Sequence, residues 1–170
     1  MKRFMLIAFV SLGACGGLDE ADVAERAAAA LQPFKKELKA ALLGALAKGP
    51  EAAIDVCATE APAIAKRASH DGVMVGRTAL RLRNPGNVPP PWAEGALPSL
   101  TAARVFDLGG GRAGYLEPIK LDEVCTTCHG TAVAPTLLAR IKERYPGDQA
   151  TGFAVGDVRG AFWVELAASR

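Results

Sequence analysis

The hydrophobic pattern of the first third of the chain predicts two helices. Residues 18–48 are rich in Ala, Leu, Glu and Lys, with Asp19 placed as an N-cap, and they stop before a Gly-Pro pair. In residues 51–69, apolar side chains recur at steps of three and four, which places Cys57 on the inward face of a second helix. Pro62 removes one backbone hydrogen bond from that helix, so a kink is expected there.

Beyond residue 70 the pattern changes from helical to extended. Residues 73–83 read as extended structure, and a Pro- and Asn-rich loop follows. The remaining expected elements are short helices at 92–97 and 100–106, a strand at 113–119 after three glycines, a helix at 135–145 and a last strand at 160–166. Helices followed by strands, with turns too short for repeated parallel crossovers, predict an α+β domain with an antiparallel sheet.

The first residues have the pattern of an export signal. A basic start precedes an apolar run over 4–12, which is about half the length of the roughly 20 residues that a membrane-spanning helix needs. Leu12-Gly13-Ala14-Cys15 resembles the bacterial lipobox, so residues 1–14 are interpreted as a lipoprotein signal peptide and Cys15 as the lipid-bearing first mature residue. Gly16 follows that cysteine, and because Asp is absent there, the resemblance to bacterial lipoproteins implies the outer membrane of a Gram-negative bacterium, on the periplasmic side. A plain signal peptide, with Cys15 removed or free, is the alternative.

Composition limits the partners. The chain has 170 residues, half of them apolar, which fits a single domain over 15–170. Its 20 basic and 18 acidic residues become balanced once Lys2 and Arg3 leave with the signal. No basic run remains, so we expect no nucleic-acid partner, and membrane contact only through the N-terminal lipid.

The strongest chemical signal is a Cys-x-x-Cys-His motif formed by Cys125, Cys128 and His129. Two thiols one helical turn apart can add to the two vinyl groups of a porphyrin, and the histidine next in line then reaches the iron. A dithiol redox pair and half of a zinc site share the two cysteines. However, a zinc site needs a second clustered pair, and a redox pair does not need the histidine. The motif therefore predicts one covalently attached haem c, with His129 as an axial ligand.

A six-coordinate iron needs one more ligand, and the candidates outside the signal are Cys57, His70 and Met74. With Cys15 assigned to lipid and two cysteines to the haem, Cys57 has no disulfide partner. A free cysteine on an apolar helical face is usually a small core residue. The residues alone leave the three candidates open.

Several blocks of this chain resemble the bacterial PAS-like haem c domain family, long catalogued as a domain of unknown function. The family occurs as single exported proteins and as the input domain of sensor histidine kinases. The blocks that carry the resemblance are residues 52–57, 61–65, 76–78, 83–87, 125–130, 150–153 and 156–161. The resemblance implies a PAS-like antiparallel sheet with a long N-terminal helix and flanking helices. It also implies a cysteine ligand from the preceding helix, which corresponds to Cys57 here.

Three arginines precede the Asn-Pro-Gly-Asn turn. On a strand, Arg77, Arg81 and Arg83 would share one face and could contact the haem propionates. They could equally form a solvated edge that prevents strand pairing.

These features predict a binding protein rather than an enzyme, since one haem and two histidines offer little acid–base equipment; incidental peroxidase-like activity stays open. A Cys57 thiolate would favour Fe(III) and a low reduction potential. We expect its loosening on reduction to free a site for a diatomic gas such as NO or CO. The predicted function is a redox or gas sensor with His/Cys ligation and an unidentified redox or signalling partner; a monohaem c-type electron carrier is the alternative.

Overall fold

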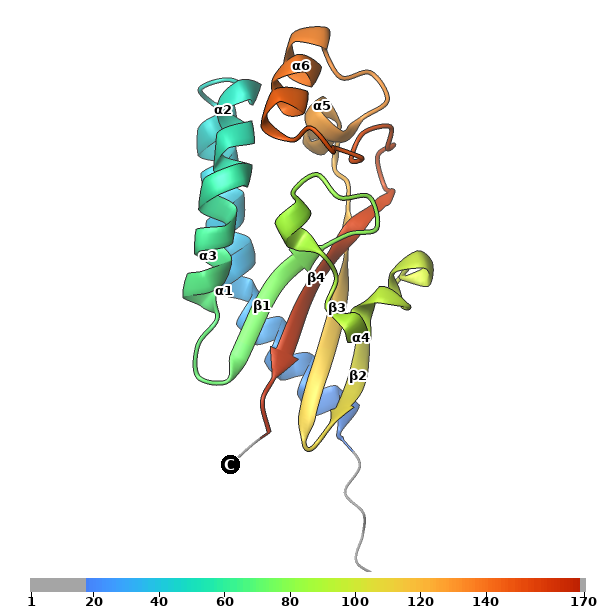
Figure 1. The fold of residues 1–170 in the computed structure, drawn as a ribbon. Helices are drawn as coiled ribbons and strands as arrows, with labels where there is room; N and C mark the ends of the chain where they lie inside the picture. Colours follow the sequence, from blue (N-terminus) through green and yellow to red (C-terminus); the bar gives the residue numbers. More distant parts are fainter. Residues whose placement is uncertain (1–17, 169–170) are drawn as a thin grey trace, which may run out of the picture.

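An antiparallel sheet lies at the centre of residues 18–168, the part of the chain that the computed structural model describes. Its four strands are β1 (Val73–Thr78), β2 (Arg104–Gly109), β3 (Arg112–Lys120) and β4 (Val158–Leu166), in the order β1-β4-β3-β2. The expected α+β class is thus confirmed (Figure 1). The signal peptide expected over 1–14 and the lipid-bearing Cys15 lie outside the described residues.

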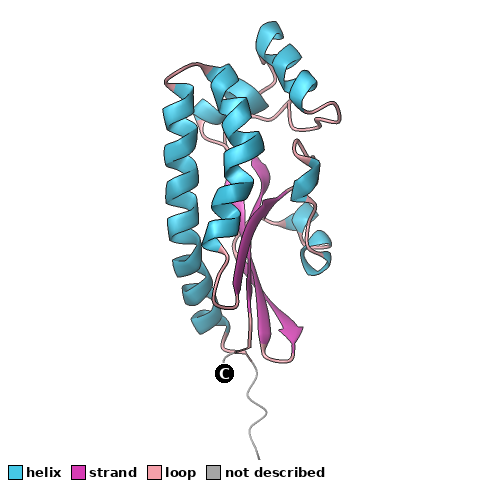
Figure 2. Cartoon of the chain, turned by 60° about the vertical axis from the view of Figure 1, so that its left-hand side comes forward, coloured by secondary structure: helices cyan, strands magenta, loops and turns pink. Residues whose placement is uncertain are grey.

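The long first helix covers one face of the sheet. It runs as α1 (Glu20–Leu46), and the Asp19 carboxylate caps it by accepting hydrogen bonds from the backbone N–H groups of Ala21 and Asp22. Its apolar stripe packs against inward residues of β1, β3 and β4; the buried members of the stripe are Val23, Ala27, Leu31, Phe34 and Leu38. Figure 2 shows the long helices on this side of the sheet and the short ones on the other.

The second helix contains a π-helical turn. It consists of α2 (Pro50–Asp55), the π-helix η1 (Val56–Glu60) and α3 (Ala61–Ala68). The Ala61 N–H bonds to the Val56 carbonyl, five residues back, and Pro62 follows with no N–H of its own. The wider turn accommodates the proline ring where we expected a kink, and it contains Cys57.

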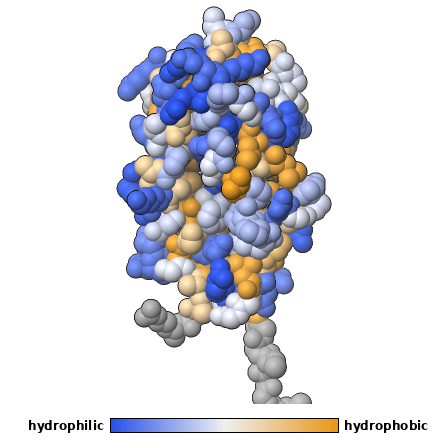
Figure 3. Space-filling model, viewed as in Figure 1, coloured by the Kyte–Doolittle hydropathy of each residue, from blue (hydrophilic) through white to orange (hydrophobic). Residues whose placement is uncertain are grey.

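Short helices cover the other face. They are η2 (Pro85–Asn87), α4 (Pro91–Glu94) and η3 (Leu97–Ser99), and the Pro-rich segment between them has no regular structure. A second apolar cluster lies beneath them; it comprises Ala93, Ala96, Leu97, Leu100, Leu116 and Ala161, flanked by Trp92, Phe106 and Trp163. Large exposed apolar side chains include Leu80, Val88 and Val155. Figure 3 shows apolar surface in the middle of this view, bordered by hydrophilic residues.

Two expected elements were wrong. The helix expected over 100–106 is replaced from Arg104 by β2, because the turn at Gly109–Gly111 brings this segment alongside β3, where Phe106 pairs with Gly114. Extended structure expected up to Arg83 ends at Thr78, the last residue of β1 to pair with β4. The short helix expected over 92–97 is split between α4 and η3.

The remaining helices lie at the upper end of the sheet in Figure 1. They are η4 (Glu123–Cys125), α5 (Thr126–His129) and α6 (Pro135–Arg144). A third apolar cluster joins α6 to the second helix and to the motif; it comprises Ile54, Leu137, Ile141 and Tyr145, with Ala58, Cys128 and Val133 packed against them. Among residues 18–168, no helix combines the length and the apolar character needed to cross a bilayer.

Candidate functional site

The Cys-x-x-Cys-His motif forms a tight helical turn. Cys125 ends η4, and Cys128 and His129 lie in α5; both cysteines are free and half-buried. A hydrogen bond of 2.8 Å, donated by the Gly130 N–H to the Thr126 carbonyl, closes the turn. A Cβ at position 130 would lie only 2.5 Å from that same oxygen, so a glycine follows the histidine for steric reasons.

The His129 ring is held in one orientation by the segment that precedes β4. Its Nδ1 lies 2.7 Å from the Ala150 carbonyl oxygen. Because a carbonyl only accepts, Nδ1 donates its proton and Nε2 is left as the free lone pair. Burial, and then the charges of Arg83 and Arg159, lower the pKa of His129 to about 3. The ring is therefore neutral, which is the form that binds a metal.

A buried ion pair fixes the backbone on both sides of that histidine. Arg83 Nε lies 2.9 Å from Oδ1 of Asp148, and the two side chains are only 10% and 4% exposed. Arg83 Nη2 also donates to the Cys128 carbonyl at 2.7 Å and to the Ala150 carbonyl at 3.3 Å. One guanidinium thus connects the motif to the carbonyl that orients His129.

Of the three candidates for the second ligand, the structure brings Cys57 to the motif. Ile54 and Ala58, which lie within three residues of Cys57, belong to the apolar cluster against which Cys128 packs. Burial is the main cause that raises the pKa of Cys128, and the charge of Cys57 raises it further. His70 and Met74 lie near the opposite end of β1, and their side chains are exposed to solvent. Along the strand, Met74 is about 13 Å from Thr78, the last residue of β1. Figure 1 shows the turn between α3 and β1 at the far end of the sheet from α5.

Two polar side chains beside Cys57 lack partners. Burial raises the pKa of Tyr145 and lowers that of Arg77, and the charge of Cys57 acts on both. The Tyr145 hydroxyl is buried without a hydrogen-bond partner among the described residues. Arg77 is half-buried, and within residues 18–168 no hydrogen bond offsets its burial.

Two arginines, Arg81 and Arg159, lie around Phe153 near the segment that orients His129. Arg81 donates from Nε to the Gln149 carbonyl at 2.9 Å and also bonds to the Thr151 carbonyl. Arg81 and Arg159 both stack on the ring of Phe153, at 4.4 and 5.3 Å from its centroid. The Arg159 Nη1 atom is buried without a partner within residues 18–168.

The structure thus places Cys57, Cys125, Cys128, His129 and the three predicted arginines in one region. The expectation that Arg77, Arg81 and Arg83 share a strand face was wrong, because β1 ends at Thr78 and the later two leave the sheet in bends. Sequence reasoning missed the structural parts played by Asp148, Tyr145 and Arg159. The only sequence signal for these residues is their place at the edge of a predicted feature. Asp148 follows the Pro-Gly break, Tyr145 ends the helix expected over 135–145, and Arg159 precedes the strand expected over 160–166.

These residues fit a haem c. Two free thiols one turn apart match covalent attachment, and a neutral imidazole with its Nδ1 bonded to a carbonyl matches an iron ligand. The buried donors without partners, on Tyr145 and Arg159, match a group with acceptor oxygens. Cys57 is a half-buried free thiol in the helix that packs near the motif.

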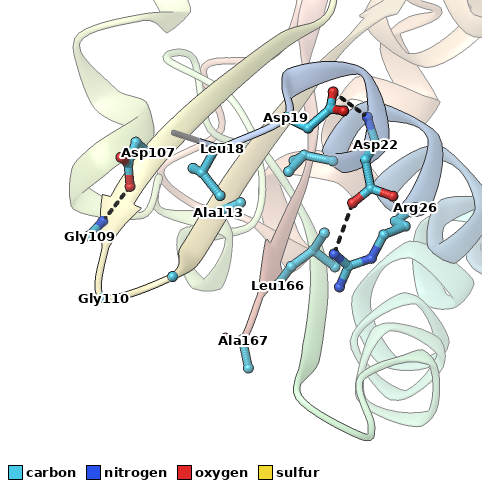
Figure 4. A pocket seen from close by; sticks show the side chains of 12 residues that line it. Leu18, Asp19, Asp22, Arg26, Asp107, Gly109, Gly110, Ala113, Leu166 and Ala167 are labelled. Atoms are coloured by element: carbon cyan, nitrogen blue, oxygen red, sulfur yellow. Dashed lines mark hydrogen bonds and ion pairs between the residues drawn. The ribbon is translucent and has the colours of Figure 1, made fainter. Parts of the chain in front are cut away.

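A hollow of about 310 Å³ at the other end of the sheet is not part of this site. Three carboxylates line it, but the chain satisfies each one, as Figure 4 shows: Asp19 caps α1, Asp22 pairs with Arg26, and Asp107 accepts from the Gly109 N–H. Within residues 18–168, no three or more acidic, histidine or cysteine side chains come together in a group that could hold a metal ion.

Comparison with known proteins gives a family and a fold. A family model described as Tll0287-like matches residues 18–167. The crystal structure of the cyanobacterial haem protein Tll0287 is similar with a TM-score of 0.62 and 23% sequence identity, over 90% of this chain and 98% of that one. At that identity the match supports the fold alone. No curated protein matches.

Proposed function

This chain belongs to the Tll0287-like family, and on that premise we propose that it is a haem c protein that senses redox state or a diatomic gas. Membership indicates haem binding, since the solved structure that resembles it is that of a haem protein. The observation that carries the proposal is the contact of His129 Nδ1 with the Ala150 carbonyl beside two free motif thiols, which presents Nε2 as a preoriented ligand.

Four side chains would hold the group. Cys125 and Cys128 would attach it covalently, and His129 and Cys57 would be the ligands of its iron. When bound, the haem would supply a redox-active iron able to take up small gases. In this proposal, the buried hydroxyl of Tyr145 and the half-buried Arg77 lie beside Cys57 and stabilise negative charge on its sulfur.

The position of Cys57 supports sensing over simple electron transfer. It lies in a π-helical turn, a geometry frequent at functional sites because its extra residue can be redistributed along the helix. The helix continues directly into α3, whose Ala61 and Ile64 belong to the main core with α1 and β1. A change at Cys57 would therefore pass into the sheet and the long helix.

Absorption and EPR spectra of the protein made with haem-attachment machinery test this proposal. We expect low-spin Fe(III) with thiolate character in the wild type, and loss of low-spin character in Cys57→Ala. In the reduced protein we expect uptake of CO or NO. Met74→Leu is the matched control, since that exposed side chain lies at the far end of β1.

The contrary results are equally specific. A His/Met spectrum that disappears in Met74→Leu would make the protein an electron carrier. A thiolate that stays bound after reduction, with no gas uptake, would remove the sensing role while leaving haem binding intact. A mass that does not increase by one haem would refute covalent attachment.

The proposal also includes the cell compartment. We place the protein on the periplasmic side of the outer membrane, anchored through lipid on Cys15, because the leading residues 1–15 carry an export signal and a lipobox. Its partner in signalling or electron transfer would then be a periplasmic or membrane protein.

A further inference from the structure

Arg159, which lies beside His129, is surrounded by the charges of three other arginines and a single carboxylate. The charged groups that act most strongly on Arg159 are Arg83, Asp148, Arg77 and Arg81. Two of the four guanidinium groups are bonded to the chain through both Nε and Nη2. Arg83 pairs with Asp148 and binds two carbonyls, and Arg81 binds the carbonyls of Gln149 and Thr151.

Arg159 differs from Arg81 and Arg83, because its Nε and Nη1 donors lack acceptors. Its Nε lies 3.3 Å from His129 Nδ1, but that nitrogen already donates its proton to the Ala150 carbonyl at 2.7 Å. One ring nitrogen cannot donate and accept in the ring plane at once, so the shorter contact excludes the longer one as a hydrogen bond. Nη1 is buried with no partner within residues 18–168.

A buried guanidinium without an acceptor is unfavourable, more so beside other cations. Within residues 18–168 no hydrogen bond joins Asp148 to Arg159: Oδ1 accepts from Arg83 Nε and from the Ala150 N–H, and Oδ2 accepts from Arg83 Nη2. The excess of arginine charge over carboxylate charge, together with the unbonded donors of Arg159, would be compensated by an anion with oxygen acceptors next to Arg159. A carboxylate matches the planar fork of an arginine.

We infer that Arg159 binds a carboxylate of the haem, and that Arg81 and Arg83 instead build the wall of the site. The assignment rests on the proposed function, since it requires the haem to be present. A small groove of about 110 Å³ opens at Arg159 and Arg81, with apolar walls from Leu80, Leu97, Leu100 and Phe153. Its apolar lining strengthens a charge-assisted bond at its basic end, because fewer waters compete there.

Resonance Raman spectra and reduction potentials of the haem-loaded protein test this assignment. We expect Arg159→Gln to shift the propionate bending band to lower frequency, because a charge-assisted hydrogen bond is lost. We also expect a lower midpoint potential, since removing a cation near the iron favours Fe(III). Arg159→Lys keeps the charge but loses the fork, so the band should shift while most of the potential is retained. Arg67→Gln, an exposed arginine that pairs with Glu37, is the control and should change neither.

Each other outcome overturns the inference. Covalent haem with an unchanged propionate band in Arg159→Gln would exclude the contact, and a shift in Arg77→Gln instead would transfer it to that residue. A wild-type potential that depends on added acetate, with the dependence lost in Arg159→Gln, would show that the carboxylate comes from solution. Absence of bound haem in the wild type would refute the proposed function itself, so the two failures are distinguishable.

Discussion

Arg83→Met is expected to lower the free energy of unfolding by about 3–5 kcal/mol, the cost of leaving one member of a buried ion pair uncompensated. The Asp148 carboxylate, 4% exposed, would lose its bidentate partner, and the Cys128 carbonyl would lose the 2.7 Å bond that connects it to the same guanidinium. Because Arg83 also reaches the Ala150 carbonyl, the segment that orients His129 should loosen as well.

Urea unfolding followed by circular dichroism measures this loss. Arg112→Met is the matched control, since Arg112 pairs with Glu165 at the surface and should lose no more than about 1 kcal/mol. The double variant Arg83→Met/Asp148→Leu should recover part of the stability, because it removes the unpaired charge. If Arg83→Met costs no more than the control does, the buried pair does not stabilise this site.

Gly160→Ala is expected to destabilise the protein by about 1–3 kcal/mol, toward the upper end, because the new methyl group would meet backbone rather than a movable side chain. An added Cβ would lie 2.2 Å from the Thr78 carbonyl oxygen and 2.9 Å from the Ala79 Cβ. Gly160 lies where β4 passes the end of β1, directly after Arg159, so the strand that carries that arginine must shift.

The same unfolding measurement, together with the propionate band of the haem-loaded protein, checks this expectation. Gly44→Ala is the control, in which the free energy of unfolding is expected to rise rather than fall. Position 44 lies inside α1 with nothing within 4 Å of an added Cβ, so alanine there should stabilise the helix by about 0.5–1 kcal/mol. Equal stability of the two alanine variants would contradict the close packing of β4 against β1.

Local chemistry explains the elements that sequence reasoning predicted well. The N-cap at Asp19 and the run of helix-forming residues define α1, and the triple glycine marks the turn between β2 and β3. A helix was wrongly predicted over residues 100–106, because the extended conformation of β2 depends on its pairing with β3 more than on the strand propensity of its own residues. The π-helical turn before Pro62 was likewise missed, since a kink and a wider turn can each accommodate a proline that lacks the backbone N–H.

The sequence by itself determined the motif at Cys125 to His129, because its chemistry depends on spacing within a single helical turn. It also narrowed the opposite ligand to three residues. Only the tertiary structure brought Cys57 near the motif and left His70 and Met74 at the far end of β1, since this arrangement depends on how α6 packs on the second helix. Only the tertiary structure, likewise, distinguishes Arg81 and Arg83, which bond to backbone carbonyls, from Arg159, whose buried Nη1 has no partner within residues 18–168. The hydrogen bonds of Arg83 and Arg81 join residues 45 to 70 positions apart, and such partners cannot be read from local spacing.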